Sequence, residues 1–147
     1  MTENGDVVGW GRNDHGQVGT SEGEEEEGGE GGETRGKDKM TLPRLISLPD
    51  QLKREGGVKE IRVGAEHNVA LSFHGRVWSW GWNEHGQLGL GDTDDRFQPS
   101  LVMSVPRVEQ DSSHLLVSGY GFSLLLIALD HSHPLIDTNP SSFSSNK

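Results

Sequence analysis

The sequence predicts an all-β fold that is built from a repeated structural unit. Residues 75–91 contain three of the four tryptophans, and an earlier copy of this stretch lies at residues 5–19. At a shift of 70 residues, nine of the fifteen aligned positions are identical, which indicates a repeat protein. The apolar fraction of 31% and the 21 glycines suit short strands and turns, and no window shows the 3.6-residue period of a helix.

Composition and charge exclude several classes of function. The net charge of −10 disfavours binding to the phosphate backbone of nucleic acids. The chain has no cysteine, so we expect neither a disulfide framework nor thiol chemistry. The N-terminus is polar, unlike a signal peptide, and the apolar run at residues 124–129 is far shorter than the roughly 20 residues of a membrane helix. We therefore expect no membrane insertion and a cytoplasmic location, with the nucleus as a second location.

The first copy of the repeat begins in the middle of a structural unit. Asn4-Gly5 predicts the tip of a β-hairpin, but the chain before it is too short to supply the first strand. Residues 6–12 are expected to form the return strand, and residues 13–19 a loop with glycines at its tight turns. We therefore assign residues 1–20 to half of a unit.

Residues 21–39 form an insert of a different composition. The insert has seven Glu and one Asp against three basic residues, and it contains no apolar side chain that a core could bury. Such a segment is expected to be a disordered Gly/Glu-rich loop, with an acidic docking segment for a basic partner as the alternative. Without these 19 residues the repeat spacing of 70 becomes 51, close to the roughly 50-residue period of some propeller blades.

Residues 40–129 carry the other repeat units. In chain order we expect an edge strand at 42–49, a polar connection at 50–57, one strand at 61–73, a turn at 74–75 and a return strand at 76–82. Residues 119–126 echo residues 64–71, 55 positions earlier, which predicts a further copy of that strand. From residue 130 the composition turns to Ser, Pro, Asn and Thr, so we expect residues 130–147 to form a disordered tail.

The repeat resembles the regulator of chromosome condensation repeat. The strand and loop at residues 75–92, Pro99 after them and the Gly64-x-x-His67 strand occur in the order typical of that repeat. Members of the family fold as a β-propeller, typically with seven blades. The resemblance implies a partial propeller here, about two antiparallel four-stranded blades of such a ring. Within the family, the repeats are similar to those of members that act as guanine-nucleotide exchange factors in secretion.

Two blades do not close a ring. Repeat units bury their faces against neighbours, and about three are usually needed for stability. We therefore expect this chain to be the C-terminal piece of a longer protein, as a truncated form, an isoform or a fragment. The alternative is a self-complementing oligomer that closes a ring by head-to-tail contacts.

Residues that recur at the same place in both copies are expected to be scaffold. Tryptophans pack between blades, and polar side chains satisfy loop backbone groups that have no strand partner. By the two-residue period of a strand, Trp78, Trp80 and Trp82 share one face. The recurring set is Trp10, Gly11, Asn13, His15, Gly16 and Gln17 in the first copy and Trp80, Gly81, Asn83, His85, Gly86, Gln87 and Gly89 in the second.

Four residues are candidates for contact with a protein partner, namely Glu66, His67, Trp82 and Glu84. In exchange factors of the family, acidic and histidine side chains near the Gly-x-x-His strand face the GTPase, and Glu66 and His67 are the positions that match. Trp82 stands where the first copy has Arg12, which indicates an exposed loop position, and Glu84 lies on the same loop. The alternative interpretation of His67 is a buried, hydrogen-bonded residue of the repeat.

The last repeat departs from this pattern. Tyr120-Gly121-Phe122 replaces the acid and the histidine, so the carry-over of an exchange site is weaker there.

No pattern of covalent catalysis is present in the sequence. A nucleophile elbow, a phosphate-binding loop and a paired-carboxylate motif are all missing, so we expect no enzyme and no cofactor. One histidine per repeat does not bring several ligands together, and His131-Ser132-His133 has a chelating spacing without a third ligand nearby. We expect no metal site.

Three hypotheses of function follow. The favoured one is a fragment of an exchange-factor-like propeller, which acts by protein contacts on a small GTPase or the secretion machinery. Exchange needs no covalent chemistry, because the factor acts by differential binding to the states of the GTPase. The second hypothesis is a non-catalytic interaction propeller. The third, from the enzyme class, is a metal hydrolase that uses histidine residues.

Overall fold

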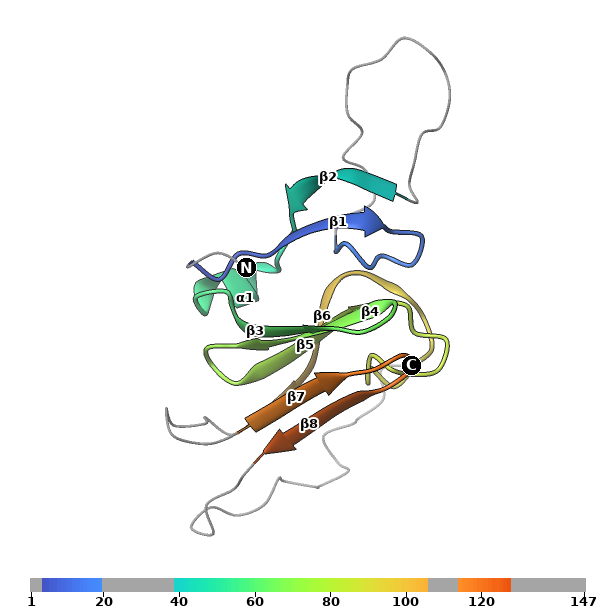
Figure 1. Cartoon of the computed structure of the whole chain (residues 1–147). Coiled ribbons are helices and arrows are strands. Elements are labelled where there is room, and N and C mark those ends of the chain that lie inside the picture. The colour runs from blue at the N-terminus through green and yellow to red at the C-terminus, as the bar shows by residue number, and fades with distance from the viewer. Residues whose placement is uncertain (1–3, 20–38, 106–113, 128–147) are drawn as a thin grey trace, which may run out of the picture.

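The computed structural model describes residues 4–19, 39–105 and 114–127, which form three antiparallel sheets and one short helix (Figure 1). The four-stranded sheet lies between two two-stranded sheets, in the order of the chain. The elements are β1 (Val8–Arg12), β2 (Lys39–Leu45), α1 (Asp50–Arg54), β3 (Val58–Val63), β4 (His67–Ser72), β5 (Arg76–Gly81), β6 (Arg96–Ser104), β7 (His114–Ser118) and β8 (Ser123–Ile127). Most of the predicted acidic insert and the predicted tail at 130–147 lie outside the described residues.

The sheet of β3, β4, β5 and β6 is a complete blade, and it confirms the predicted antiparallel four-stranded unit. β4 is buried along its whole length because its two faces pack against two neighbouring sheets. Ala70 belongs to the core on the side of the first sheet, whereas Val69 and Leu71 belong to the core on the side of the third sheet. Successive side chains of a strand point to opposite faces, which produces this division.

The first sheet is the outer half of a blade. β1 and β2 pair with Val8 opposite Leu45, and β1 carries the sequence that β5 repeats 70 residues later. β2 is the outer strand of this pair and contains Pro43, which an edge strand accommodates because its nitrogen needs no ladder partner. The β1–β2 pairing joins segments from the sequence ranges 1–20 and 40–129 in one sheet.

The third sheet is the inner half of a blade. β7 and β8 pair with Leu116 opposite Leu125, and they repeat β3 and β4 about 55 residues later. β7 lies against β3 and β4 of the complete blade (Figure 1). The described residues therefore hold one complete blade between two half blades of complementary kind.

The predicted strand at 61–73 is wrong in extent, because the chain forms two strands there. Residues 64–66 form a turn between β3 and β4, closed by a hydrogen bond from the Gly64 N–H to the His67 carbonyl at 2.8 Å. Val63 and Val69 lie six positions apart, which is an even offset, so the apolar alternation continues across the turn without a change of face. The alternation by itself therefore hides the break.

A short helix, α1, replaces the polar connection predicted at 50–57. Its five residues are too few to show a helical period in the sequence. Leu52 is its one buried residue and is 0% exposed. It packs in the core cluster between the first sheet and the complete blade, with Val7, Ile46, Leu48, Val58, Ala70, Trp78 and Trp80.

Trp80 performs the blade-to-blade packing that the sequence predicted for two tryptophans. Its side chain is 0% exposed, and its indole N–H donates to the Gln17 carbonyl of the first sheet's loop at 3.2 Å. Trp10 has the same place in β1 but is 63% exposed. Among the described residues, no further sheet lies on the outer side of β1 and β2 to cover it.

We expect Leu52→Ala to lower the free energy of unfolding by about 2–5 kcal/mol, because it opens a cavity under α1 in a fully buried site. Lys53→Ala is the matched control on the exposed side of the same helix, and it should stay within about 0.5 kcal/mol of the wild type. Urea denaturation followed by tryptophan fluorescence measures both values. Equal effects of the two substitutions would contradict this account of α1.

Candidate functional site

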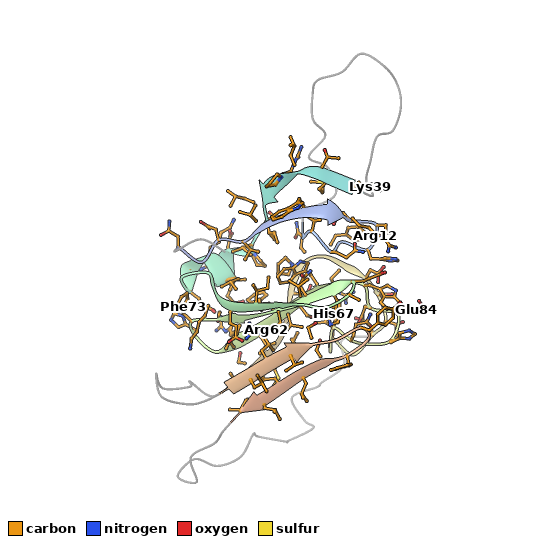
Figure 2. The ribbon with its side chains drawn as sticks, in the orientation of Figure 1. Arg12, Lys39, Arg62, His67, Phe73 and Glu84 are labelled. Atoms are coloured by element: carbon orange, nitrogen blue, oxygen red, sulfur yellow. The ribbon has the colours of Figure 1, made fainter. Side chains whose placement is uncertain are left out.

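Loops and turns from all three sheets gather at one end of the strands. We call this end the loop rim, defined by residues 12–19, 64–66, 82–95 and 119–121. Arg12, His67 and Glu84 lie towards this end, whereas Phe73 lies at the opposite end of the molecule (Figure 2). The rim collects the candidate residues that the sequence places in different repeats.

The loops that follow β1 and β5 are braced by the same hydrogen bonds. The Asn13 side-chain oxygen accepts from the Val18 N–H at 2.9 Å, and the Asn83 side-chain oxygen accepts from the Leu88 N–H at 3.0 Å. Asn83 is fully buried and Asn13 nearly so. Each asparagine therefore satisfies a buried loop amide that has no strand partner.

A second pair of bonds also repeats in the two loops. The side-chain oxygens of Gln17 and Gln87 each accept from the backbone N–H two residues earlier, at His15 and at His85, and both distances are 2.9 Å. The side chain of Gln17 further donates to Asp14 at 3.0 Å. The glutamines thus fix the tip of each loop and present its side chains in a defined direction.

Several of the recurring glycines have a positive φ, which other residues rarely adopt. Gly81 has φ 108°, and a Cβ there would lie 2.6 Å from the carbonyl oxygen of Glu66 in the turn before β4. Because Gly81 has no side chain, the backbone of the 64–66 turn can lie close to β5. The other members of the recurring set with positive φ are Gly11, Gly16, Gly86 and Gly89.

Charged side chains bridge the first sheet and the complete blade at the rim. The Arg12 guanidinium bonds the Asp14 carboxylate at 2.8 Å and the Glu66 carboxylate at 3.0 Å. His15 lies 2.7 Å from Asp95 through Nδ1 and 3.9 Å from Glu66 through Nε2. Glu66 is half-buried. Its negative charge is balanced by the ion pair with Arg12.

Aromatic side chains take the corresponding place between the complete blade and the third sheet. β5 ends at Gly81, so Trp82 lies beyond the strand that holds Trp78 and Trp80. The Trp82 ring contacts His85 edge-on at 5.0 Å between centroids and Tyr120 at 6.3 Å. Trp82 occupies the repeat position of Arg12, so the bridge changes from an ion pair to an aromatic contact.

The second loop also carries the most acidic part of the rim. Asn83 holds this loop by donating its side-chain N–H to the Asp92 and Asp94 carbonyls, both at 3.0 Å. The side chain of Glu84 is exposed, as are those of Asp92 and Asp94. The backbone N–H of Asp94 is the main reason why the pKa of Asp92 lies below its ordinary value, with Arg96 adding to the effect. The loop thus presents carboxylates at its surface.

His67 lies beneath the rim rather than on its surface. It is 1% exposed, and its Nε2 lies 2.9 Å from Ser118 Oγ and 3.0 Å from Ser123 Oγ. Ser123 donates its own hydrogen to the Gln87 carbonyl at 3.0 Å, so it accepts from His67 and Nε2 carries the proton. This network connects the complete blade to the third sheet. His67 is buried in this network, whereas Ser118 is half-buried and Ser123 is exposed.

The described part of the chain contains further histidine and acidic side chains. Within it, no group of three or more His, Cys, Asp or Glu side chains could hold a metal ion. The predicted chelating pair His131 and His133 lies outside the described residues. No helix of the described segments is long and apolar enough to cross a membrane.

Sequence reasoning missed the partners that hold the rim together. Arg12 and Asp14 are two residues apart in the first loop and Asp95 lies in the second, and nothing in their spacing predicts that they meet around Glu66 and His15. One signal was available. Arg12 and Trp82 differ at one repeat position, whereas the other two differences between the loops are conservative, and a change of this kind indicates a junction-specific contact.

Comparisons with known proteins identify the repeat. The family model described as the regulator of chromosome condensation (RCC1) repeat matches residues 4–71 and 74–126, and a second model of the same description matches residues 58–87. These matches include all three sheets.

Three relatives illustrate the similarity. The chain is 37% identical over 135 residues to the secretion-regulating guanine nucleotide exchange factor of Mus musculus, covering 91% of this chain and 28% of that protein. It is 33% identical over 104 residues to the ultraviolet-B receptor UVR8 of Arabidopsis thaliana, covering 71% of this chain and 20% of the receptor. The crystal structure of Prp20p from Saccharomyces cerevisiae matches with a TM-score of 0.63 and 27% identity, covering 84% of this chain and 27% of that chain.

These matches confirm the predicted partial propeller and the similarity to an exchange factor in secretion. The chain spans between a fifth and somewhat more than a quarter of the length of these relatives.

We expect Arg12→Ala to raise the pKa of Asp14 from about 2 towards the ordinary value of 3.8, because the hydrogen bond from Arg12 is the main cause of the lowered pKa. A carbon-13 NMR titration of the side-chain carboxylates measures the change. Arg54→Ala removes a cation from α1 and should leave the pKa of Asp14 as it is. An Asp14 pKa that stays near 2 in Arg12→Ala would contradict the assignment.

We expect the protein to lose stability as the pH falls below the ordinary His67 pKa of 6.5. Burial lowers the pKa of His67 in the folded state, against a weaker opposing effect of the Phe122 backbone. The unfolded chain therefore binds a proton at this residue at a higher pH than the folded chain. The stabilising contribution is complete above pH 6.5 and is lost as the pH falls through the folded-state pKa.

Urea denaturation between about pH 7.5 and about pH 5 measures this loss. His67→Gln should flatten the pH dependence over that range. The exposed His74→Gln is the control and should keep the wild-type slope. Identical slopes for His67→Gln and the wild type would rule out His67 as the group responsible.

Proposed function

Because the chain belongs to the family of regulator of chromosome condensation (RCC1) repeat proteins, we propose that it acts by protein–protein interaction as part of an exchange-factor-like propeller. Its proposed partner is a small GTPase, and its proposed setting is the regulation of secretion. The mouse relative is named as a guanine nucleotide exchange factor that regulates secretion, and Prp20p is described by its binding to Gsp1p and histones. These names are the reason for placing a GTPase first among the candidate partners.

The observation that carries the proposal is the composition of the loop rim. Tyr120 is 70% exposed and Trp82 is half-buried beside it, while Glu84 and Asp94 present carboxylates on the neighbouring loop. Aromatic side chains supply much of the binding energy of protein interfaces, and surrounding charges steer the approach of an oppositely charged partner. The rim combines both features, and the loop that carries Trp82, Glu84 and Asp94 is held from below by Asn83.

The rim could serve exchange without any reactive group. An exchange factor works by binding the nucleotide-free state of the GTPase more tightly than the nucleotide-bound state. Carboxylates near the nucleotide site of the GTPase would repel phosphate, so Glu84 and its acidic neighbours suit this role. The same negative charge disfavours a nucleic-acid partner, and the proposed partner places the protein in the cytoplasm or the nucleus.

One observation favours the second candidate, a non-catalytic interaction module. Glu66 matches the acidic position of the family's exchange site, but its carboxylate is engaged by Arg12 at 3.0 Å. The corresponding turn of the third sheet has Tyr120 and Gly121 and offers neither an acid nor a histidine. A surface of this kind could bind a partner without opening its nucleotide site.

We expect Trp82→Ala to weaken binding to a cognate small GTPase by about tenfold or more, because it removes an aromatic side chain from the centre of the rim. Binding of the purified chain to a panel of small GTPases, each nucleotide-free and GDP-loaded, is measured by isothermal titration calorimetry. Phe73→Ala is the matched control, since it removes an aromatic side chain that is 55% exposed at the opposite end (Figure 2). Binding that is lost equally in both variants would contradict the rim as the contact surface.

Release of a fluorescent GDP analogue from the same GTPases separates the two candidates. Faster release in the presence of the chain supports exchange activity, whereas tight binding without faster release supports the non-catalytic module. No binding to any member of the panel would overturn the choice of a small GTPase as the partner.

A further inference from the structure

Two strands of the described half blades have an open edge at a position where the complete blade has a paired edge. β1 pairs with β2 alone and β8 pairs with β7 alone, whereas in the complete blade β4 and β5 are joined edge to edge. β8 has the repeat position of β4, and β1 has the repeat position of β5. The two open edges are therefore the two sides of one missing strand pair.

We propose that a second copy of this chain docks head-to-tail, with its β1 paired to the β8 of the first copy. The β7–β8 hairpin of one copy and the β1–β2 hairpin of the next then form one four-stranded blade. An exposed strand edge with free N–H and C=O groups readily takes up such an added strand. Three further observations support a copy of this chain as the occupant.

The first observation is an unfilled space at Gly11. Gly11 and Gly81 have nearly the same φ, 109° and 108°. A Cβ on Gly81 would lie 2.6 Å from the Glu66 carbonyl oxygen and 2.8 Å from the His67 Cα of the adjacent strand. A Cβ on Gly11 would meet no atom of the described residues within 4 Å. Gly81 of β5 allows a neighbouring backbone to approach, and its counterpart Gly11 in β1 lies beside an open edge.

The second observation is a matching donor and acceptor. The Gln17 carbonyl accepts from the Asn68 side chain at 2.8 Å and from the Trp80 indole at 3.2 Å. The Gln87 carbonyl is its repeat counterpart and accepts from Ser123, which stands where Asn68 stands in the complete blade. The Gln87 carbonyl can accept a second hydrogen bond, at the position that the Trp80 indole takes at the Gln17 carbonyl.

Trp10 of the second copy supplies this indole. It repeats Trp80 and is 63% exposed in the single chain. Docking would therefore bury a large apolar side chain and would complete the same two-donor arrangement at the Gln87 carbonyl that Gln17 has in the first junction.

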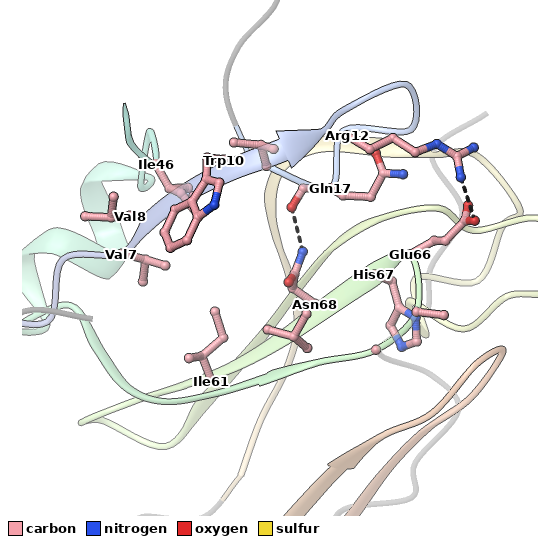
Figure 3. Close-up of a pocket in the computed structure, with 15 residues that line it drawn as sticks. Val7, Val8, Trp10, Arg12, Gln17, Ile46, Ile61, Glu66, His67 and Asn68 are labelled. Atoms are coloured by element: carbon pink, nitrogen blue, oxygen red, sulfur yellow. Dashed lines mark hydrogen bonds and ion pairs between the residues drawn. The ribbon is translucent and has the colours of Figure 1, made fainter. Parts of the chain in front are cut away.

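The third observation is an apolar groove along the open edge of β1 (Figure 3). The groove has a volume of about 390 Å³ and lies between β1 and β3, with Val8 and Trp10 on one side and Ile61 and Val63 on the other. The β7–β8 hairpin has apolar side chains to fill it. Leu124 and Leu126 are 46% and 51% exposed, although Val69 and Leu71 at the same repeat positions are buried against a neighbouring sheet.

The repeat also specifies the register of the new pair. Asn68 lies opposite Trp80 in the complete blade, so Ser123 of one copy should lie opposite Trp10 of the other. The contact uses different surfaces on the two copies, so it propagates until the chain of copies closes into a ring or continues as a filament. Three or four copies would supply about six to eight blades, which lies within the usual range of closed propellers.

Sedimentation velocity and light scattering test the association from about 1 to about 100 μM chain, where interfaces of micromolar affinity assemble. We expect the mass of the wild type to rise with concentration to a small multiple of the 16.1 kDa chain or to larger polymers. Trp10→Ala and Leu126→Lys should each weaken association by about tenfold or more. Phe73→Ala, an exposed aromatic outside the contact, should associate as the wild type does.

A cross-linking experiment tests the register, since the chain has no native cysteine. A mixture of the Trp10→Cys and Ser123→Cys variants should form a disulfide-linked pair on mild oxidation. A mixture of Trp10→Cys and Met103→Cys, which places the second thiol on β6, should not. Circular dichroism of each variant shows that it keeps its sheet content.

A wild type that remains a monomer over the whole concentration range would overturn the proposal. Association without the Trp10–Ser123 cross-link, or with equal cross-linking in the control mixture, would also overturn it, because another surface would then hold the copies together. None of these outcomes depends on GTPase binding, so this inference and the proposed function can fail separately.

Discussion

The arrangement of the first sheet against the complete blade depends on the hydrogen bonds that the Gln17 carbonyl accepts. This carbonyl accepts hydrogen bonds from the Asn68 side chain and the Trp80 indole, so one loop of the first sheet holds two adjacent strands of the complete blade. Both donors are buried, and an unpaired donor at this depth would be costly. The loop must therefore keep one shape, which the Asn13 side chain enforces from below.

The same loop design supports different surfaces at the two junctions. Arg12 and Glu66 form an ion pair across the first junction, and Trp82 and Tyr120 form an aromatic contact across the second. The buried asparagine of the loop is the same in both copies, so the outer side chains can change without loss of the fold. This separation allows a repeat protein to change its partner while it keeps its scaffold.

Much of the fold and part of the site could be predicted from the sequence. The recurring Trp, Gly and Asn positions predicted an antiparallel repeat, and the family match and the three sheets confirm it. The helix around Leu52 was not predicted, because five residues are too few to show a helical period of apolar residues. The turn before His67 was not predicted, because the alternation of apolar residues continues across it. The sequence proposed Glu66 and Trp82 as contact residues, and that role stays a prediction; it did not indicate Arg12, because its partner Glu66 lies 54 residues away in the chain.

The sequence by itself determined the repeat, the fold class and the positions where a loop needs glycine or asparagine. These features depend on contacts within one unit, so the same residues recur at the same spacing in each copy. The tertiary structure decided which equivalent residues are buried and which are exposed. Trp80 and Trp10 have the same place in their strands, yet one is covered and the other is 63% exposed. Burial of a blade face depends on the adjacent unit, and the spacing within a repeat carries no information about that neighbour.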